Sequence, residues 1–309
     1  MKILITGGAG FIGSQIADKY INIGHDVIII DNLISGRKEY INKKAVFYPV
    51  DIEDKKQINE IFLKEKPDIL NHHAAQMSVR NSVEDPLYDA RVNIIGLLNL
   101  MEAGRQNGLK KVIFASSGGV VYGDAKIIPT SEDYVPKNPL SPYGVSKLTG
   151  ENYLYFYWKN YDIAFVALRY ANVYGPRQNP HGEAGVVAIF SQKLLKGERP
   201  TINGTGKQTR DYIFIDDIVD ANIKALETDY IGPLNIGTGK ETDVNTIFDE
   251  LKSLTKSNLE PLYGPPKMGE QQRSSLDIKS ARQNINWIPN VSLQHGLSVT
   301  VDYFQNKHE

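Results

Sequence analysis

The stretch that decides the fold is Lys2–Gly13, which reads KILITGGAGFIG. It opens with a short apolar run, KILIT, of the kind that forms a strand buried on both faces of a sheet. Gly7, Gly10 and Gly13 follow at the spacing GxxGxxG, and an amphipathic stretch begins at the end of this motif. Strand, glycine-rich turn and helix in this order are typical of a dinucleotide-binding unit, because the turn and the helix N-terminus present backbone N–H groups to a pyrophosphate. An incidental glycine-rich turn is the alternative, and the flanking strand and helix weigh against it.

Outward from this motif, apolar runs alternate with stretches of helical periodicity through the first half of the chain. The apolar runs are Lys2–Thr6, Val27–Ile30, Ala45–Val50, Ile69–Asn71 and Val112–Ser116, and the helical stretches are Phe11–Ile23, Lys55–Lys64 and Asp89–Gln106. This alternation predicts an α/β fold with a Rossmann-type, doubly wound parallel sheet.

Beyond Asn172 the pattern loosens and Gly and Pro become frequent, which indicates a smaller mixed α/β substrate-binding domain. The segment 211–226, DYIFIDDIVDANIKAL, again reads as a strand, an N-cap and a helix. We therefore expect a dinucleotide-binding domain of residues 1–171 plus about 211–237. The substrate-binding domain would be discontinuous, comprising about 172–210 plus 238–309.

The end of the second expected strand indicates which dinucleotide binds. Asp31 lies there, and a carboxylate at this place accepts hydrogen bonds from the adenosine ribose and repels a 2′-phosphate, so NAD is expected rather than NADP. Arg37 could serve such a phosphate, although a solvated loop charge is the simpler interpretation. Asp51 follows the third strand and is expected to meet the adenine. A helix N-cap is the alternative for Asp51, and a stronger one for Asp54.

Tyr143 and Lys147 form a YxxxK arrangement near the start of an expected helix, Ser146–Asn160. Residues four apart lie on one helical face. A tyrosine titrates near 10, so a catalytic base at neutral pH needs its pKa lowered by about three units, or roughly 4 kcal/mol. A neighbouring ammonium and a positive nicotinamide ring would both favour the tyrosinate. Ser116 and Ser117, at the carboxyl end of a strand, could add a hydroxyl donor or could simply shape the turn into Gly118 and Gly119.

Composition excludes several other classes of function. The net charge of −1 offers no field for a nucleic acid or an anionic membrane. The absence of Cys excludes disulfides and thiolate sites, and the histidines lack HxH or HExxH spacing, so no metal site is expected. No signal peptide or apolar stretch of about 18 residues is present, so we expect a cytoplasmic protein that does not enter a membrane.

A series of motifs along nearly the whole chain resembles the nucleotide-sugar epimerase family of the extended short-chain dehydrogenases/reductases. In order, the motifs are GGAGFIG, DNLISG, HHAAQ, SSGGVVYGD, SPYGVSK, LRYANVYGPR, GTGKQTRDYIFIDD and NIGTG. The resemblance implies a tightly held NAD and reversible C4 epimerisation of a UDP-hexose, such as UDP-glucose or UDP-galactose, through a 4-keto sugar. It implies a homodimer as well, for which the aromatic run Tyr153–Trp158 is a candidate interface; packing against the sheet is the alternative.

The resemblance also implies roles for individual residues. Tyr143 would be the base, Lys147 would tune its pKa and anchor the ribose, and Ser117 would assist. The residues expected to bind the cofactor are Gly7, Gly10, Phe11, Ile12, Gly13, Asp31, Asn32, Ser35, Gly36, Asp51, Ile52, Ala74, Ala75, Asn93, Ser116, Tyr143, Lys147 and Tyr170. Those expected to bind the substrate are Ser117, Gly118, Tyr143, Asn172, Val187, Arg210 and Arg273, the two arginines at the diphosphate. Surface salt bridging is the alternative for both arginines.

Comparison with the family pattern and with its dehydratase relatives refines this expectation. Gly118 stands where a third hydroxyl residue is usual, so its role is lost or passes to Ser117. The loop SSGGVVYG carries no carboxylate, so dehydration lacks its general acid. Ser274 is small where some relatives carry Tyr, which predicts room for N-acetylated hexoses. A UDP-glucuronate epimerase or decarboxylase, a nucleotide-sugar reductase, and a non-catalytic NAD sensor remain alternatives.

Overall fold

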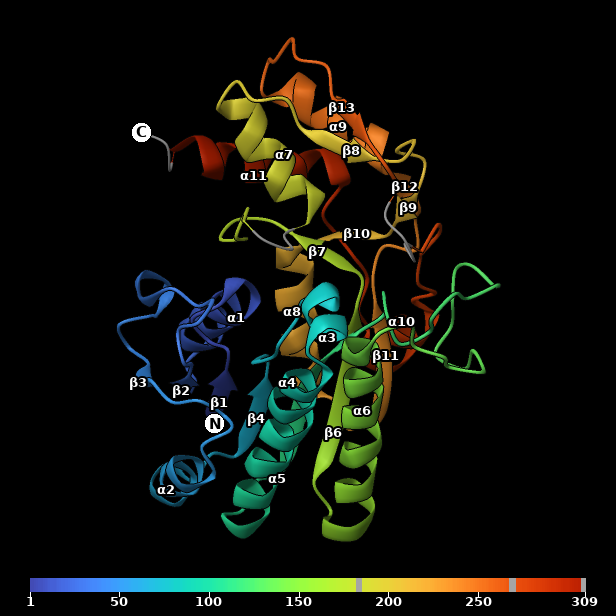
Figure 1. Ribbon diagram of the computed structural model, residues 1–309. Helices are drawn as coiled ribbons and strands as arrows, with labels where there is room; N and C mark the ends of the chain where they lie inside the picture. The colour runs from blue at the N-terminus through green and yellow to red at the C-terminus, as the bar shows by residue number, and fades with distance from the viewer. Residues whose placement is uncertain (182–184, 267–270, 307–309) are drawn as a thin grey trace.

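Seven parallel strands form the central sheet of the computed structural model, which describes residues 1–181, 185–266 and 271–306 (Figure 1). Their order is β11-β6-β5-β4-β1-β2-β3, so the direction of winding reverses between β1 and β4. The strands are β1 (Lys2–Thr6), β2 (Asp26–Ile30), β3 (Val46–Tyr48), β4 (Ile69–His72), β5 (Lys111–Ser117), β6 (Ala164–Tyr170) and β11 (Gly232–Ile236). This confirms the predicted Rossmann-type, doubly wound sheet.

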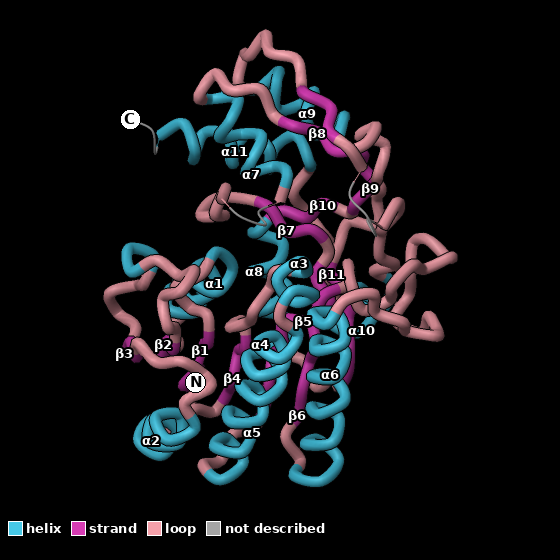
Figure 2. Tube along the Cα trace, viewed as in Figure 1, coloured by secondary structure: helices cyan, strands magenta, loops and turns pink. Residues whose placement is uncertain are grey.

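Helices cover both faces of the sheet because successive strand residues point to opposite faces. On one face, Leu4 and Phe114 share a buried cluster with residues of α2, α5 and α6, and on the other face Ile3 and Ile113 pack with α1 and α8. These helices are α1 (Phe11–Asn22), α2 (Lys55–Glu65), α5 (Gly96–Gln106), α6 (Pro142–Tyr161) and α8 (Ile215–Glu227). Figure 2 shows the same layers by secondary structure.

Short elements lead into α5. They are α3 (Val79–Glu84), α4 (Pro86–Ala90) and a π-helical stretch over Arg91–Ile95. Sequence periodicity predicts one helix from Asp89 to Gln106, whereas the structure has this wider-wound stretch inside it. Helix α6 begins at Pro142 rather than Ser146, because Ser141 accepts a hydrogen bond from the backbone N–H of Gly144 and proline suits the first helical turn.

The second half of the chain adds a smaller layer beyond the carboxyl ends of the strands (Figure 1). Its described residues form three small strand pairs and three helices. The pairs are β7 (Asn172–Tyr174) with β10 (Tyr212–Phe214), β8 (Thr201–Asn203) with β13 (Leu262–Gly264), and β9 (Thr209–Arg210) with β12 (Thr242–Asp243). The helices are α7 (Val186–Leu195), α9 (Val244–Leu254) and α11 (Leu293–Asn306), while α10 (Lys279–Ile285) packs on β11.

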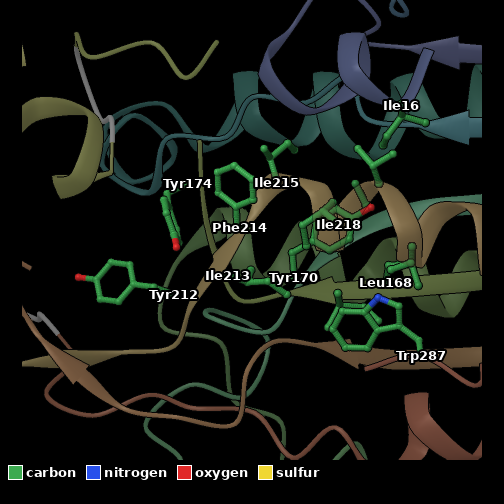
Figure 3. Close-up of a cluster of buried hydrophobic side chains, with 14 of the residues drawn as sticks. Ile16, Leu168, Tyr170, Tyr174, Tyr212, Ile213, Phe214, Ile215, Ile218 and Trp287 are labelled. Carbon is green, nitrogen blue, oxygen red and sulfur yellow. The ribbon is translucent and has the colours of Figure 1, made fainter. Parts of the chain in front are cut away.

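The chain passes between these two layers more than once. After β6 it enters the smaller layer at β7, and it returns through α8 to add β11 at the sheet edge beside β6. Buried side chains join the layers at this crossing, where Tyr174 and Phe214 lie edge to face next to Ile215 (Figure 3). Because β6 runs directly into β7, the carboxyl ends of all seven parallel strands face the smaller layer. Within the described ranges, no helix is long and apolar enough to cross a bilayer.

Candidate active site

The glycine-rich turn after β1 has no room for side chains. Gly7 has φ of +70°, and a Cβ atom added to it would lie 2.7 Å from the backbone nitrogen of Ala74. A Cβ atom on Gly13 would lie 2.3 Å from the carbonyl oxygen of Gly7. Gly10 donates its N–H to the Gly7 carbonyl, and α1 starts at Phe11 and Ile12. The turn therefore presents bare backbone and a helix N-terminus, which fits a dinucleotide pyrophosphate.

Asp31 lies directly after β2 and shapes the neighbouring loop. Its carboxylate accepts hydrogen bonds from the backbone N–H groups of Ala9 at 3.0 Å and Leu33 at 2.8 Å. Burial raises the pKa of Asp31, and these two N–H groups oppose the rise. A Cβ atom on Gly36 would lie 2.7 Å from one carboxylate oxygen, so the loop packs closely over Asp31, while Ser35 is exposed beside it.

Asn32 and Asp51 meet at the ends of adjacent strands. The Asn32 amide donates to the Asp51 carboxylate at 2.7 Å, which brings together two residues predicted to bind the adenosine half of NAD. The N-cap of α2 is Asp54, which accepts from the N–H groups of Lys56 and Gln57, so Asp51 does not cap this helix. Ile52, next to Asp51, is buried against α5.

Tyr143 and Lys147 lie one turn apart in α6 and face the carboxyl end of β5. The Lys147 ammonium donates to the carbonyl oxygen of Ala115 at 2.8 Å and lies 5.7 Å from the centre of the Tyr143 ring. The Tyr143 hydroxyl shares a hydrogen bond with the side chain of Ser117. The structure thus brings together the three residues that the sequence analysis assigns to catalysis.

Burial sets the protonation of this pair. Desolvation raises the pKa of Tyr143, the charge of Asp89 raises it further, and the bond to Ser117 opposes the rise. Burial lowers the pKa of Lys147 to about 8, opposed by the carboxylates of Asp89 and Glu151. The protein's own groups therefore hold Tyr143 as a neutral phenol, and an additional positive charge is needed to make it a base near pH 7.

The last two residues of β5, Ser116 and Ser117, are the candidate serines, and they have different partners. Ser117 faces Tyr143, whereas the Ser116 hydroxyl donates to Glu151 at 2.6 Å. A Cβ atom on Gly118 would lie 2.4 Å from a methyl carbon of Leu276, so a third hydroxyl side chain would collide with the segment that carries Arg273. Packing of Leu276 explains why this chain departs from the family pattern at Gly118.

A buried polar cluster surrounds Asn93, which is predicted to bind the cofactor. Asn93, in the π-helical stretch, donates to the Asp89 carboxylate at 2.9 Å and to the backbone carbonyl of Gln76 at 2.9 Å. Asp89 also accepts from the Ser146 hydroxyl at 2.6 Å and from the Gln76 amide at 3.0 Å. The Asn93 side-chain oxygen accepts from the Gln76 N–H. The side chain of Asn93 is therefore hydrogen-bonded to protein groups at both its nitrogen and its oxygen. Its binding of the cofactor stays a prediction.

Tyr170 and the residues after β4 line the same region. The Tyr170 hydroxyl lies 3.1 Å from the Nε2 atom of His73 and accepts from the Asn222 amide at 2.8 Å. Burial lowers the pKa of His73 to about 3, so its imidazole is neutral at physiological pH. Ala74 and Ala75 follow His73 and are half-buried.

Four of the predicted substrate residues come from four different segments of the smaller layer. Asn172 begins β7, and its N–H donates to the carbonyl of Asp211 at 2.8 Å. Arg210, in β9, donates to the carbonyl of Thr209. Arg273 forms a bidentate ion pair with Glu241 at 2.6 and 3.0 Å, which is the surface salt bridge considered as its alternative. Val187 is buried in the first turn of α7.

The sequence analysis did not identify Asp89 and Glu151, the two carboxylates that act on Lys147. Glu151 follows Lys147 by four residues, as Lys147 follows Tyr143, so helical spacing alone could have placed it on the same face. Asp89 had no such signal, because only folding brings it to Ser146, 57 residues away in sequence.

Comparison with known proteins identifies the family to which this geometry belongs. A model described as the NAD dependent epimerase/dehydratase family matches residues 3–237. The chain belongs to this family.

Relatives of this epimerase-family chain match it along its whole length. It is 47% identical to a putative UDP-glucose 4-epimerase of Methanocaldococcus jannaschii over 306 residues, 99% of each protein. The structure of Thermotoga maritima UDP-glucose 4-epimerase with UDP-glucose is similar at a TM-score of 0.98 and 48% identity, with each chain fully covered. That of Thermus thermophilus UDP-glucose 4-epimerase with NAD has a TM-score of 0.93 and 40% identity, covering 99% of each chain. The predicted family and NAD cofactor are confirmed.

Proposed function

We propose that this protein catalyses the reversible C4 epimerisation of a UDP-hexose, exchanging UDP-glucose and UDP-galactose through a transient 4-keto sugar. The observation that carries the proposal is the facing arrangement of Tyr143, Lys147 and Ser117 where α6 meets the end of β5. The relatives named UDP-glucose 4-epimerase, one of them in complex with UDP-glucose, support the choice of substrate.

Each catalytic side chain has a defined task in this reaction. The Tyr143 hydroxyl oxygen takes the proton of the sugar 4-hydroxyl and later returns it. The Lys147 ammonium, held by the Ala115 carbonyl, favours the tyrosinate by its charge. Ser117, hydrogen-bonded to Tyr143, orients the phenol and the reacting oxygen.

The residues that would hold NAD lie along the carboxyl ends of β1, β2 and β4. Gly7, Gly10 and Gly13 supply the backbone against the pyrophosphate, and Asp31 faces the adenosine ribose. Bound NAD supplies a hydride acceptor and a positive ring charge beside the phenol. Since burial alone raises the pKa of Tyr143, NAD-loaded protein should deprotonate this residue more readily than unloaded protein.

On the substrate side, we propose that Asn172, Arg210 and Arg273 bind the diphosphate region. For Arg273 this requires exchange of its partner Glu241 for a phosphate, which an exposed ion pair allows at small cost. Ser274 is buried and small, and we propose that the space it leaves admits an N-acetyl group.

The decisive experiment is separate incubation with UDP-galactose, UDP-N-acetylgalactosamine and UDP-glucuronate, with the products resolved by chromatography. Formation of UDP-glucose from UDP-galactose without added NAD is expected, because an epimerase regenerates its cofactor in each cycle. Turnover of UDP-glucuronate alone would favour the alternative, a glucuronate epimerase or decarboxylase. Good turnover of UDP-galactose with none of UDP-N-acetylgalactosamine would contradict the assignment of Ser274.

We further propose a cytoplasmic homodimer that joins through α6 and the short helices beside it. Exposed apolar side chains gather on these elements; they are Val79, Val83, Leu87, Ile95, Val145, Tyr155 and Phe156. Paired apolar surfaces of this kind are typical of subunit interfaces. We also propose the two-domain division expected from the sequence. In this arrangement the sugar binds between the central sheet and the smaller layer.

A further inference from the structure

Three residues on one face of α6 contact three consecutive residues at the end of β5. Tyr143 shares a hydrogen bond with Ser117, Lys147 donates to the carbonyl of Ala115 at 2.8 Å, and Glu151 accepts from the Ser116 hydroxyl at 2.6 Å. Because the three α6 residues are four apart, they lie along one stripe of the helix. The proposed function uses Tyr143 and Lys147 but leaves Glu151 without a task.

Glu151 is buried and has a second partner on the next strand. Its carboxylate receives two hydrogen bonds from the Arg169 guanidinium, at 2.9 and 2.5 Å, and the two side chains are 7% and 2% exposed. Arg169 also donates to the Tyr122 hydroxyl at 2.8 Å, which in turn donates to Asn235. A buried ion pair seldom stabilises a fold more than apolar residues of the same volume would. The Glu151–Arg169 pair lies beside Tyr143 and Lys147, and this position points to a role other than stability.

Lys147 is surrounded by groups of both charge types. The charged or titratable side chains that interact with Lys147 come from three places in the chain. They are Asp89 from α4, Tyr143 and Glu151 from α6, and His72 and His73 at the end of β4 and directly after it. Burial lowers the pKa of both histidines, so they carry no positive charge at neutral pH. The Phe114 ring lies 4.9 Å from the ammonium. The negative charges available to hold Lys147 as a cation are thus Asp89 and Glu151.

We propose that Glu151 is a positioning residue for the catalytic pair: it ties α6 to β5 through Ser116, and its carboxylate is a countercharge one helical turn from Lys147. The inference rests on the proposed function. Arg169 holds the Glu151 carboxylate in a single orientation from the opposite side. Asp89 and Glu151 differ in their effect on Tyr143. The charge of Asp89 raises the pKa of Tyr143 and so opposes its deprotonation, whereas Glu151 lies two helical turns away from Tyr143 along α6.

The test compares Glu151→Gln with the wild-type protein by titrating Lys147 directly. Protein labelled with [ε-13C]lysine reports each amine through its Cε chemical shift, and loss of one signal in Lys147→Arg assigns it. Removing the Glu151 charge should move the titration midpoint of Lys147 to lower pH by about half a pH unit or more. The alkaline limb of the pH profile of kcat should move in the same direction.

Asp217→Asn is the matched control. Asp217 is also a buried carboxylate, but it accepts the backbone N–H groups of Asn290 and Val291, away from α6. This variant should lose thermal stability and leave the Lys147 midpoint unchanged. An unchanged midpoint in folded Glu151→Gln, or an equal shift in Asp217→Asn, would overturn the countercharge role. If Glu151→Gln does not fold, Glu151→Asp keeps the charge and shortens the side chain, so it should lower kcat and leave the Lys147 midpoint as in the wild type. A midpoint lowered by about half a pH unit or more in this variant would overturn the countercharge role.

Ser116→Ala tests the tether separately, because it leaves the Glu151–Arg169 pair intact. We expect kcat to fall several-fold while the Lys147 midpoint stays as in the wild type. Unchanged kcat, or a shifted Lys147 midpoint, would instead show that Ser116 is not a tether. A wild-type protein that turns over no UDP-hexose would refute the proposed function, yet the amine titration would still decide whether Glu151 sets the charge of Lys147.

Discussion

Tyr143 is the side chain on which the proposed chemistry depends, since its hydroxyl is the proposed base and is hydrogen-bonded to Ser117 at the end of β5. Tyr143→Phe removes this oxygen and keeps the ring. Turnover of UDP-galactose should fall by about 10²- to 10⁴-fold, the usual contribution of a general base, with little change in thermal stability. Tyr153→Phe, more exposed on the same helix, is the control and should retain activity. Wild-type turnover by Tyr143→Phe would remove the base from the mechanism.

Lys147 makes the stability of the fold depend on pH. Its ordinary pKa is 10.5, and burial lowers the pKa to about 8 in the folded protein. Between these values the unfolded chain binds more protons, so the contribution of Lys147 to the free energy of unfolding rises as the pH increases from 8 to 10.5. Below pH 8 the full cost of burying the ammonium remains.

Lys147→Met should therefore change the pH dependence of unfolding. The free energy of unfolding of the wild type, minus that of the variant, should increase by about 3 kcal/mol between pH 8 and 10.5. Urea unfolding at several pH values measures this difference. A difference that stays constant over the window would mean that Lys147 titrates normally in the folded protein.

At the scale of elements, Asp211 joins the segments that carry the predicted substrate residues. Its buried carboxylate accepts from the Thr238 N–H and hydroxyl at 2.7 and 2.6 Å, from the Gly239 N–H at 3.0 Å and from the Leu276 N–H at 3.2 Å. It thereby connects the end of β9 to the loop after β11 and to the segment following Arg273.

Asp211→Asn replaces one acceptor oxygen with a donor that faces backbone N–H groups. We expect a loss of about 1 to 3 kcal/mol in stability and a rise in KM for the UDP-hexose that exceeds any fall in kcat, because the catalytic stripe of α6 is untouched. Thermal unfolding and steady-state kinetics measure the two effects. Asp243→Asn, at the half-buried N-cap of α9, controls for general effects of removing a carboxylate from this layer. A fall in kcat at constant KM would contradict this role.

For the whole molecule, the exposed aromatic face of α6 predicts an assembly. Tyr155 and Phe156 are 52% and 45% exposed, and both lie on the surface proposed for the dimer. Tyr155→Glu with Phe156→Glu should convert the dimer to monomers in sedimentation velocity experiments. Ile127→Glu, at an exposed site in the loop between β5 and α6, should leave the assembly unchanged. A wild-type protein that sediments as a monomer at micromolar concentration would refute the interface.

Much of the nucleotide-binding half could be predicted because its signals are local. The spacing of Gly7, Gly10 and Gly13 specifies a turn that only glycine can form, and the spacing of Tyr143 and Lys147 places both on one helical face. The five apolar runs of the first half predicted strands, and they correspond to β1 to β5 in the structure. Element boundaries were less accurate, since the start of α6 depends on the cap at Ser141 and the π-helical stretch does not alter the apolar periodicity.

The sequence by itself therefore determined the class of fold and the dinucleotide, and it predicted Tyr143 and Lys147 as the catalytic pair, because each depends on residues within one or two turns of chain. Only the tertiary structure decided which charges surround that pair. The Ser116–Glu151 bond spans 35 residues, and the Asp89–Ser146 bond spans 57. Such partners meet only when whole elements pack together. The free energy that favours this packing comes from contacts throughout the core, so no local spacing of residues in the sequence reveals it.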